Sequence, residues 1–217
     1  MKSDLTFAIL LGGALVPDER VRTLVQGARA IAADGGMAHA AALGLKPELW
    51  VGDFDSTADD LLARHSGVPR QAFPAEKNFT DGELAVEEAI ARGATRLILV
   101  GAFQGARTDH ALAHLMQAVT LAERGLNLVL TSGTEEAVPL LPGSLTLDLP
   151  AGSLMSVIGF SDLGGLSLLG VKYPLQEADI AFGASRTISN VVTGPMTASL
   201  QSGRALVLAR PHDFSGS

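Results

Sequence analysis

The chain has 217 residues, of which 47% are hydrophobic and 18% charged, so it can build one large core or two smaller ones. Its formal net charge of -7 argues against a general nucleic-acid binder, because such proteins cluster Lys and Arg against phosphates. It has no cysteine, which rules out disulfides, thiolate metal sites and thiol nucleophiles.

The first half of the chain alternates short apolar runs with helix-like segments. Strands are predicted at residues 7–11, 30–33, 49–51, 97–100 and 126–130, and helices at 18–26, 37–43, 59–64, 80–91 and 109–124. The runs lack polar/apolar alternation, as expected for strands buried on both faces. The pattern predicts an α/β domain over residues 1–134, a doubly wound, mostly parallel sheet with flanking helices.

The second half is punctuated by Gly and Pro and shows no convincing helical pattern. Strands are predicted at residues 144–149, 154–160, 166–169, 187–192, 196–201 and 205–208. Short alternating strands with turn signals predict an antiparallel β-sandwich or barrel over residues 140–217. We expect the boundary near residues 135–143, where Pro139 and Pro142 stiffen the connection.

The N-terminus and hydropathy point to a cytoplasmic protein with no membrane partner. Asp4 precedes the first short apolar run, which argues against a signal peptide. No apolar stretch approaches the roughly 20 residues that cross a bilayer. The absence of cysteine fits a reducing cytoplasm.

Aspartates recur at the ends of strands and the starts of helices in the first half. They are Asp34, Asp53, Asp55, Asp81 and Asp109. Open α/β sheets bind ligands outside the carboxyl ends of their strands. Carboxylates that meet there repel each other unless a cation lies between them, and Mg²⁺ prefers oxygen ligands and substrate phosphates. The pattern therefore favours a Mg²⁺ site that handles a phosphate compound.

Each acidic motif also has a structural interpretation. Asp53 and Asp55 lie on the same side of an extended chain and suit one metal ion, or they form a turn in which Asp is a local acceptor. Gly35 and Gly36 let backbone N–H groups approach a phosphate beside Asp34, or they form an ordinary strand-to-helix turn.

Two further motifs combine acidic and basic side chains. Thr80 and Glu83 have capping-box spacing, which does not exclude metal binding by Asp81. Lys77 either neutralises a phosphate or is a plain surface lysine. In the Gly-rich loop before the last helix, Arg107 matches phosphate oxygens beside Asp109, or the two form a loop salt bridge.

His110, at the start of that helix, is interpreted as a hydrogen bonder rather than a metal ligand. In the second half, Tyr173 is the only tyrosine, and it either stacks on an aromatic ligand or lines the core. Ser189 and Asn190 follow a long loop.

In this order, the motifs resemble the thiamine pyrophosphokinase (thiamine diphosphokinase) family over nearly the whole chain. The matching segments are residues 33–36 (Ala-Asp-Gly-Gly), 52–56 (Gly-Asp-Phe-Asp-Ser), 77–83, 105–110, 170–175 and 188–190. The chain departs from the family at Asn78, which stands for an aspartate, at Ala106, which stands for a glycine, and at Val191, where an acidic residue is common.

The resemblance implies an enzyme that transfers a pyrophosphoryl group from ATP to the hydroxyl of thiamine, with Mg²⁺ as cofactor, giving thiamine diphosphate and AMP. It implies a metal and catalytic set (Asp53, Asp55, Asp81 and Asp109), an ATP set (Asp34, Gly35, Gly36, Lys77, Arg107 and His110) and a thiamine set (Tyr173, Ser189 and Asn190). Either Asp81 or Asp109 is the candidate base. It also implies a homodimer in which the β domain of one chain completes the active site of the other.

Three alternatives stay open. A related pyrophosphokinase acting on a hydroxymethylpterin would share the nucleotide half, and only the β half discriminates it. A sensor that binds a nucleotide or thiamine diphosphate without catalysis would need fewer of the aspartates. A metal-dependent phosphatase is less favoured, because the sequence shows no nucleophile motif.

Overall fold

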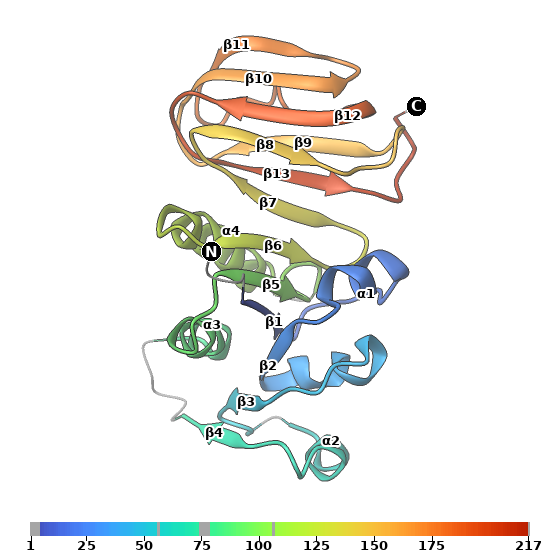
Figure 1. The fold of residues 1–217 in the computed structure, drawn as a ribbon, viewed down its shortest axis with the longest axis vertical. Helices are drawn as coiled ribbons and strands as arrows, with labels where there is room; N and C mark the ends of the chain where they lie inside the picture. Colours follow the sequence, from blue (N-terminus) through green and yellow to red (C-terminus); the bar gives the residue numbers. More distant parts are fainter. Residues whose placement is uncertain (1–4, 56, 74–78, 106, 217) are drawn as a thin grey trace. The chain divides into compact units, whose positions relative to one another are not determined.

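The protein is described by a computed structural model that covers residues 5–55, 57–73, 79–105 and 107–216. The chain divides into two compact units, drawn in sequence colours in Figure 1. The first comprises residues 1–114 and 125–133, and the second comprises residues 115–124 and 134–217.

The first unit is built on a parallel sheet. Its strands are β1 (Thr6–Leu10), β2 (Arg29–Ala33), β3 (Leu49–Gly52), β4 (Arg70–Ala72), β5 (Arg96–Val100) and β6 (Asn127–Thr131). Their order is β4-β3-β2-β1-β5-β6, and every neighbouring pair is parallel. The chain winds outward from β1 to β4 and then returns to the other side of β1 with β5. The winding direction therefore reverses between β1 and β5.

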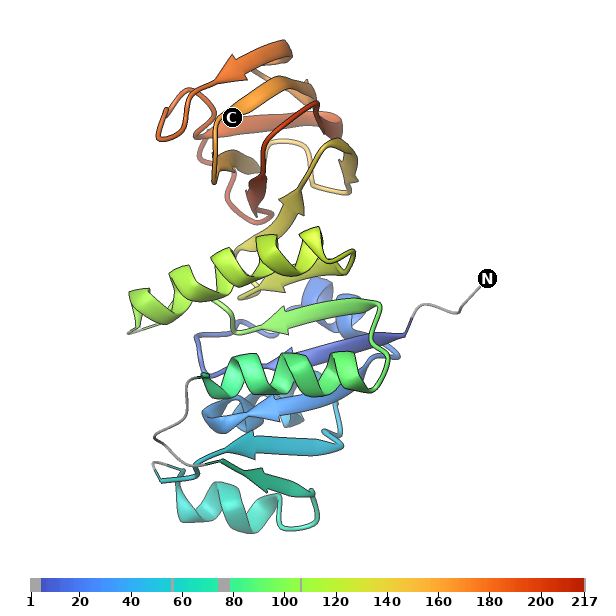
Figure 2. The ribbon, with the colours of Figure 1, turned by 90° about the vertical axis from the view of Figure 1, so that its left-hand side faces the viewer.

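Helical segments connect these strands. They are α1 (Glu19–Val25), the 3₁₀ helices η1 (Asp34–His39) and η2 (Ala41–Leu43), α2 (Asp59–Arg64), α3 (Asp81–Ala91) and α4 (Thr108–Glu123). Asp18 caps α1 by accepting the Val21 N–H at 2.8 Å. Helix α3 packs along β1, β2 and β3, as Figure 2 shows. Trp50 and Ile98 belong to the core cluster on this sheet, and both are fully buried.

The second unit is antiparallel. Its strands are β7 (Glu136–Leu140), β8 (Gly143–Leu147), β9 (Leu154–Gly159), β10 (Leu163–Val171), β11 (Leu175–Ile180), β12 (Asn190–Leu200) and β13 (Ala205–Arg210). One sheet runs β12-β9-β13-β7 and the other β11-β10-β12-β8, so β12 belongs to both. Buried residues of both sheets, such as Val207 and Leu168, share one core. The predicted combination of a parallel α/β sheet and an antiparallel β region is confirmed.

The two-sheet role of β12 explains one wrong prediction. Residues 187–192 and 196–201 were expected as separate strands because Gly194 and Pro195 lie between them, but β12 is continuous. Its pairing with β10 shifts register near this point, where a Cβ on Gly170 would lie 2.1 Å from Pro195 O. Gly and Pro therefore mark an irregularity inside a strand rather than its end.

Other differences concern short or polar elements. Residues 37–43 were predicted as an α-helix and form parts of two 3₁₀ helices, the second ended by Gly44 in the left-handed conformation. Residues 135–143, expected as a connection, contain β7, in which Pro139 lies opposite Leu206 of β13. Strands β4 and β11 were not predicted, because they are polar and largely exposed.

None of the helices in the described residues is both long enough and apolar enough to cross a membrane.

Candidate functional site

A pocket of about 310 Å³ opens in the first unit where the strand order reverses. It is lined by residues 11–13, 33–35, 80–82 and 101–105, with Arg107, His110, Ala111 and His114. Three of these segments follow the carboxyl ends of β1, β2 and β5, and the fourth opens α3. Ligands of open α/β sheets bind in this kind of crevice.

Close backbone packing holds the segments that follow β1, β2 and β5 against one another. A Cβ on Gly13 would lie 2.3 Å from Gly101 O, and one on Gly36 would lie 2.0 Å from Leu10 O. Gly101 has a φ of 71°, and its Cβ would lie 2.6 Å from Leu11 O. Only glycine fits at these positions, because the obstructing atoms are main-chain atoms.

Backbone strain gathers at the same edge of the sheet. Asp34, Phe54 and Gln104 have φ values of 43°, 62° and 61° and follow β2, β3 and β5. Non-glycine residues in the left-handed region cost free energy and cluster at functional sites. The strain favours this edge as the site.

Asp34 is held from two directions. Trp50 Nε1–H donates to Asp34 O at 2.8 Å, and the hydroxyl of Thr57 donates to Asp34 Oδ1 at 3.2 Å. Gly52, at the end of β3, packs against it, since a Cβ there would lie 3.4 Å from Asp34 Cα. The carboxylate of Asp34 therefore has a fixed position at the pocket wall.

The opening turn of α3 brings Asp81 to the pocket. Thr80 Oγ1 accepts the Glu83 N–H at 3.2 Å, and Glu83 Oε2 accepts the Thr80 N–H at 2.7 Å. This confirms the predicted capping box and commits the Glu83 carboxylate to the helix end. Asp81, in the first helical position, lines the pocket.

Arg107 and Asp109 form a two-bond ion pair. Arg107 Nε and Nη2 donate to Asp109 Oδ1 and Oδ2 at 3.0 and 2.7 Å, and both side chains are about two-thirds exposed. The guanidinium holds the pKa of Asp109 well below its usual range. The guanidinium of Arg107 is therefore aligned by Asp109 at the edge of the pocket.

Two histidines anchor the loops on either side of the crevice. His39 Nε2 lies 2.9 Å from Gly13 O, and His114 Nδ1 lies 2.7 Å from Ala102 O. A carbonyl oxygen only accepts hydrogen bonds, so each of these ring nitrogens carries the proton. Burial lowers the pKa of His114, which keeps its ring neutral at pH 7.

The structure brings together only part of the predicted nucleotide and metal residues. Asp34, Gly35, Asp81, Arg107 and His110 line the pocket, whereas Gly36, Asp53, Asp55 and Asp109 are not among the lining residues. Lys77 lies outside the described residues, as does the departure at Asn78.

The loop after β3 has a local hydrogen bond of its own. Asp53 Oδ1 accepts the Asp55 N–H at 3.1 Å, which is the turn interpretation of this motif. Among the described residues, no three or more His, Asp or Glu side chains are grouped so that they could hold a metal ion. A metal role for these aspartates stays a prediction.

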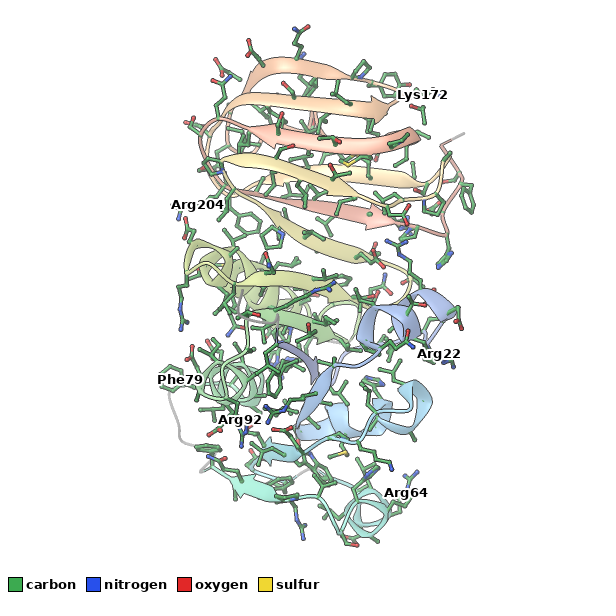
Figure 3. The ribbon with its side chains drawn as sticks, in the orientation of Figure 1. Arg22, Arg64, Phe79, Arg92, Lys172 and Arg204 are labelled. Carbon is green, nitrogen blue, oxygen red and sulfur yellow. The ribbon has the colours of Figure 1, made fainter. Side chains whose placement is uncertain are left out.

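The predicted thiamine residues are neighbours in the second unit. Tyr173 is 61% exposed, and Lys172, labelled in Figure 3, has its Nζ 6.0 Å from the centre of the tyrosine ring. Asn190 is buried. Its Oδ1 accepts the N–H groups of Tyr173 and Val191 at 3.0 and 2.9 Å, and its amide donates to Tyr173 O at 2.8 Å.

Ser189, adjacent to Asn190, has a φ of 59°. Its N–H donates to Ser156 Oγ at 3.0 Å, and it lines a second pocket of about 230 Å³ within this unit. Asn190 thus fixes the backbone at Tyr173, while Tyr173 and Ser189 are exposed.

Sequence reasoning missed part of the pocket. From the sequence alone, Gly12-Gly13 after the first predicted strand suits either a close approach to a phosphate or an ordinary turn, and no functional role is predicted for residues 101–104 or for His114. These residues share one sequence feature, which is that they follow β1 or β5 in the chain. That feature identifies a pocket only once the strand order is known, because the order makes β1 and β5 neighbours at the reversal point.

The fold and pocket define a protein of the open α/β class with a pocket at the carboxyl edge of a parallel sheet. The family described as "Thiamin pyrophosphokinase, catalytic domain" matches residues 22–130, and "Thiamin pyrophosphokinase, vitamin B1 binding domain" matches residues 145–207. The chain belongs to the thiamine pyrophosphokinase family, a family of transferases.

Individual relatives agree with this assignment. The chain is 28% identical to thiamine pyrophosphokinase of Bacillus subtilis over 151 residues, 68% of this chain and 70% of that protein. A crystal structure of the B. subtilis protein matches with a TM-score of 0.84 at 24% identity, covering 96% of this chain and 99% of that one. A thiamin pyrophosphokinase structure from Geobacillus thermodenitrificans matches with a TM-score of 0.80 at 26% identity, covering 98% and 100%.

Proposed function

We propose that the protein transfers the terminal pyrophosphoryl group of ATP to the hydroxyl oxygen of thiamine, with Mg²⁺, giving thiamine diphosphate and AMP. The observation that carries this proposal is the pocket at the β1/β5 reversal point, where Asp34, Asp81 and Arg107 converge. The thiamine hydroxyl attacks the β-phosphorus, the bond between this phosphorus and the α–β bridging oxygen breaks, and AMP leaves. Such transfers depend on positioning and electrostatics.

The donor set of the pocket fits Mg²⁺. Mg²⁺ takes hard oxygen ligands, keeps several waters and uses only one or two carboxylates together with substrate phosphates. A preformed group of three carboxylates is therefore not required. Asp81 and Asp34 line the pocket, and Asp53 and Asp55 follow Gly52, which packs on Asp34. These residues would hold the ion with the nucleotide phosphates, where it would neutralise phosphate charge.

The remaining roles follow from charge and position. Arg107, aligned by Asp109, binds phosphate oxygens through its guanidinium. Gly35 allows a phosphate or ribose close to the backbone beside Asp34, and His110 lies at the pocket wall. Asp109 is paired with Arg107 and strongly acidic, so Asp81 is the better candidate to accept the proton of the thiamine hydroxyl.

The thiamine site is assigned to the second unit. Tyr173 stacks on a ring of thiamine, whose thiazolium is cationic, and Ser189 hydrogen-bonds its aminopyrimidine. Asn190 keeps Tyr173 in place through the hydrogen bonds to its backbone.

A comparison of two acceptor substrates tests the proposal. Purified protein is incubated with ATP and Mg²⁺ and either thiamine or a hydroxymethylpterin, and AMP and the pyrophosphorylated product are separated by chromatography. AMP and thiamine diphosphate in equal amounts support the proposal. AMP only with the pterin assigns the protein to the alternative kinase, and nucleotide binding without AMP assigns it to the sensor alternative.

We also propose a homodimer in which Tyr173 and Ser189 of one protomer complete the site formed by the other protomer's aspartates. Co-expression of the Asp81→Asn and Tyr173→Ala variants tests this sharing. If sites are shared, a mixed dimer has one intact site, and random association restores about a quarter of wild-type activity. If each site is built from a single chain, the mixture stays inactive.

A further inference from the structure

His114 joins three parts of the pocket that are separate in sequence. It lies on α4, and its Nδ1–H donates to Ala102 O, in the loop after β5, at 2.7 Å. The opposite side of its ring meets the first turn of α3, where a Cβ on Gly82 would lie 3.3 Å from His114 Nε2 and 2.9 Å from a methyl of Leu11. The imidazole therefore fills the space between the β5 loop and the start of α3.

The neighbours of this imidazole carry the functional groups of the site. Ala102 begins the loop that leads to Arg107, and Gly82 follows Asp81 directly. Ala102, Gly82 and His114 all line the pocket. If the ring shifted, the distance between the pocket wall that carries Arg107 and the wall that carries Asp81 would change.

The histidine also has a defined proton arrangement. Its Nδ1 carries the proton because a carbonyl oxygen only accepts, and burial favours the neutral ring, so Nε2 is bare. An apolar side chain at position 114 would remove the hydrogen bond that Ala102 O accepts from His114. Two charged or titratable groups act on the pKa of His114, namely His110, whose ring lies 6.4 Å away, and Glu83, which is held in the capping box; Asp81 lines the same pocket.

We propose that His114 is a positioning residue for pyrophosphoryl transfer, which fixes the loop after β5 against the first turn of α3 through its Nδ1–H bond to Ala102 O. The inference rests on the proposed function for its effect on turnover. In this role His114 does not contact the reacting atoms.

Two substitutions at His114 distinguish the effect of its hydrogen bond from the effect of its side-chain volume. The amide of Asn takes the place of Nδ1 and keeps a donor for Ala102 O, whereas the longer Gln carries its amide toward the place of Nε2. We expect His114→Gln to lower kcat by about 100-fold, the size of effect that a 1 Å misplacement produces. We expect His114→Asn to stay within about threefold of the wild type. His212→Gln, at an exposed histidine of the second unit, is the control for loss of an imidazole.

A KM-against-kcat comparison separates positioning from general destabilisation. Tyr173 and Ser189 lie in the other unit, so KM for thiamine should be unchanged in His114→Gln when the protein is folded at the assay temperature. Equal kcat losses in the Asn and Gln variants, or wild-type kcat in the Gln variant, would overturn the inference.

Hydrogen exchange gives a readout that does not need turnover. Amide exchange in residues 101–105 and 80–84 should accelerate in His114→Gln and return to wild-type rates in His114→Asn. Unchanged exchange in His114→Gln would overturn the positioning role whether or not the protein is active. An inactive wild type with the expected exchange pattern would instead contradict the proposed function alone.

Discussion

The contact between Gly36 and β1 gives the sharpest structural prediction. A Cβ at position 36 would lie 2.0 Å from Leu10 O and 2.7 Å from Leu11 N, about 1.4 Å short of an ordinary 3.4 Å contact with the oxygen. Both obstructing atoms belong to the backbone at the end of β1, so no side-chain rotation relieves the clash. In Gly36→Ala the start of η1 must move away from β1.

The size of the effect follows from the nature of the clash. Overpacking in a core costs about 1–3 kcal/mol, and a clash with backbone lies at the upper end, so we expect about 3 kcal/mol. For a chain of this length, that lowers the melting temperature by roughly 6–12 °C. Thermal unfolding followed by circular dichroism measures it.

The neighbouring glycine provides the matched control. A Cβ on Gly35 would have no atom within 4 Å, so Gly35→Ala should change stability by less than about 0.5 kcal/mol. Equal melting temperatures for the two variants would refute the claim that backbone contact selects glycine at position 36.

Four further predictions concern single groups. Asp81→Asn should lower AMP formation by at least about 100-fold with an unchanged melting temperature, and near-normal turnover would remove Asp81 from the mechanism. Arg107→Ala should raise KM for ATP about tenfold. Arg107→Lys should recover only part of this loss, because lysine keeps the positive charge but lacks the two-bond fork; an unchanged KM in Arg107→Ala would refute the phosphate role. Thr80→Ala should cost about 1 kcal/mol in urea unfolding through loss of the α3 cap, and an unchanged midpoint would contradict the capping box. The pKa of His114 is lower in the folded protein than in the unfolded chain, so protonation below about pH 6.5 favours the unfolded chain. The free energy of unfolding should therefore fall more steeply between pH 7 and pH 5 in the wild type than in His114→Asn.

The sequence predicts elements well where local patterns decide the structure. The capping box at Thr80 and Glu83 is confirmed down to its hydrogen bonds, and the buried β1 and β5 appear within one residue of their predicted bounds. Both signals depend on residues close in sequence. The predicted helix over residues 109–124 agrees within one residue at each end with α4.

Local patterns fail where the tertiary context decides. Gly194 and Pro195 read as a strand end, but β12 continues through them to pair in two sheets. Pro139 reads as part of a connection, yet it lies in β7, paired with β13. The polar strand β11 is stabilised by its pairing with β10, a contact that its own sequence does not reveal.

The site shows the same division. The motifs place Asp34, Asp81 and Arg107 at the ends of elements, and the structure brings these three to one pocket. The place of His114 depends on the crossing of α4 past Ala102 and Gly82, which no local pattern encodes. For Asn190 the resemblance implied a ligand contact, which stays a prediction; the structure shows that its buried amide hydrogen-bonds to the backbone of Tyr173.

The central claim is that the pyrophosphoryl unit moves as one piece, and isotope transfer tests it most directly. The protein is incubated with thiamine, Mg²⁺ and ATP labelled with ³²P at the α, the β or the γ phosphorus, and the products are separated. We predict that the β and γ labels appear in thiamine diphosphate and the α label in AMP. Label in thiamine monophosphate from the γ position, with ADP as the second product, would contradict the account.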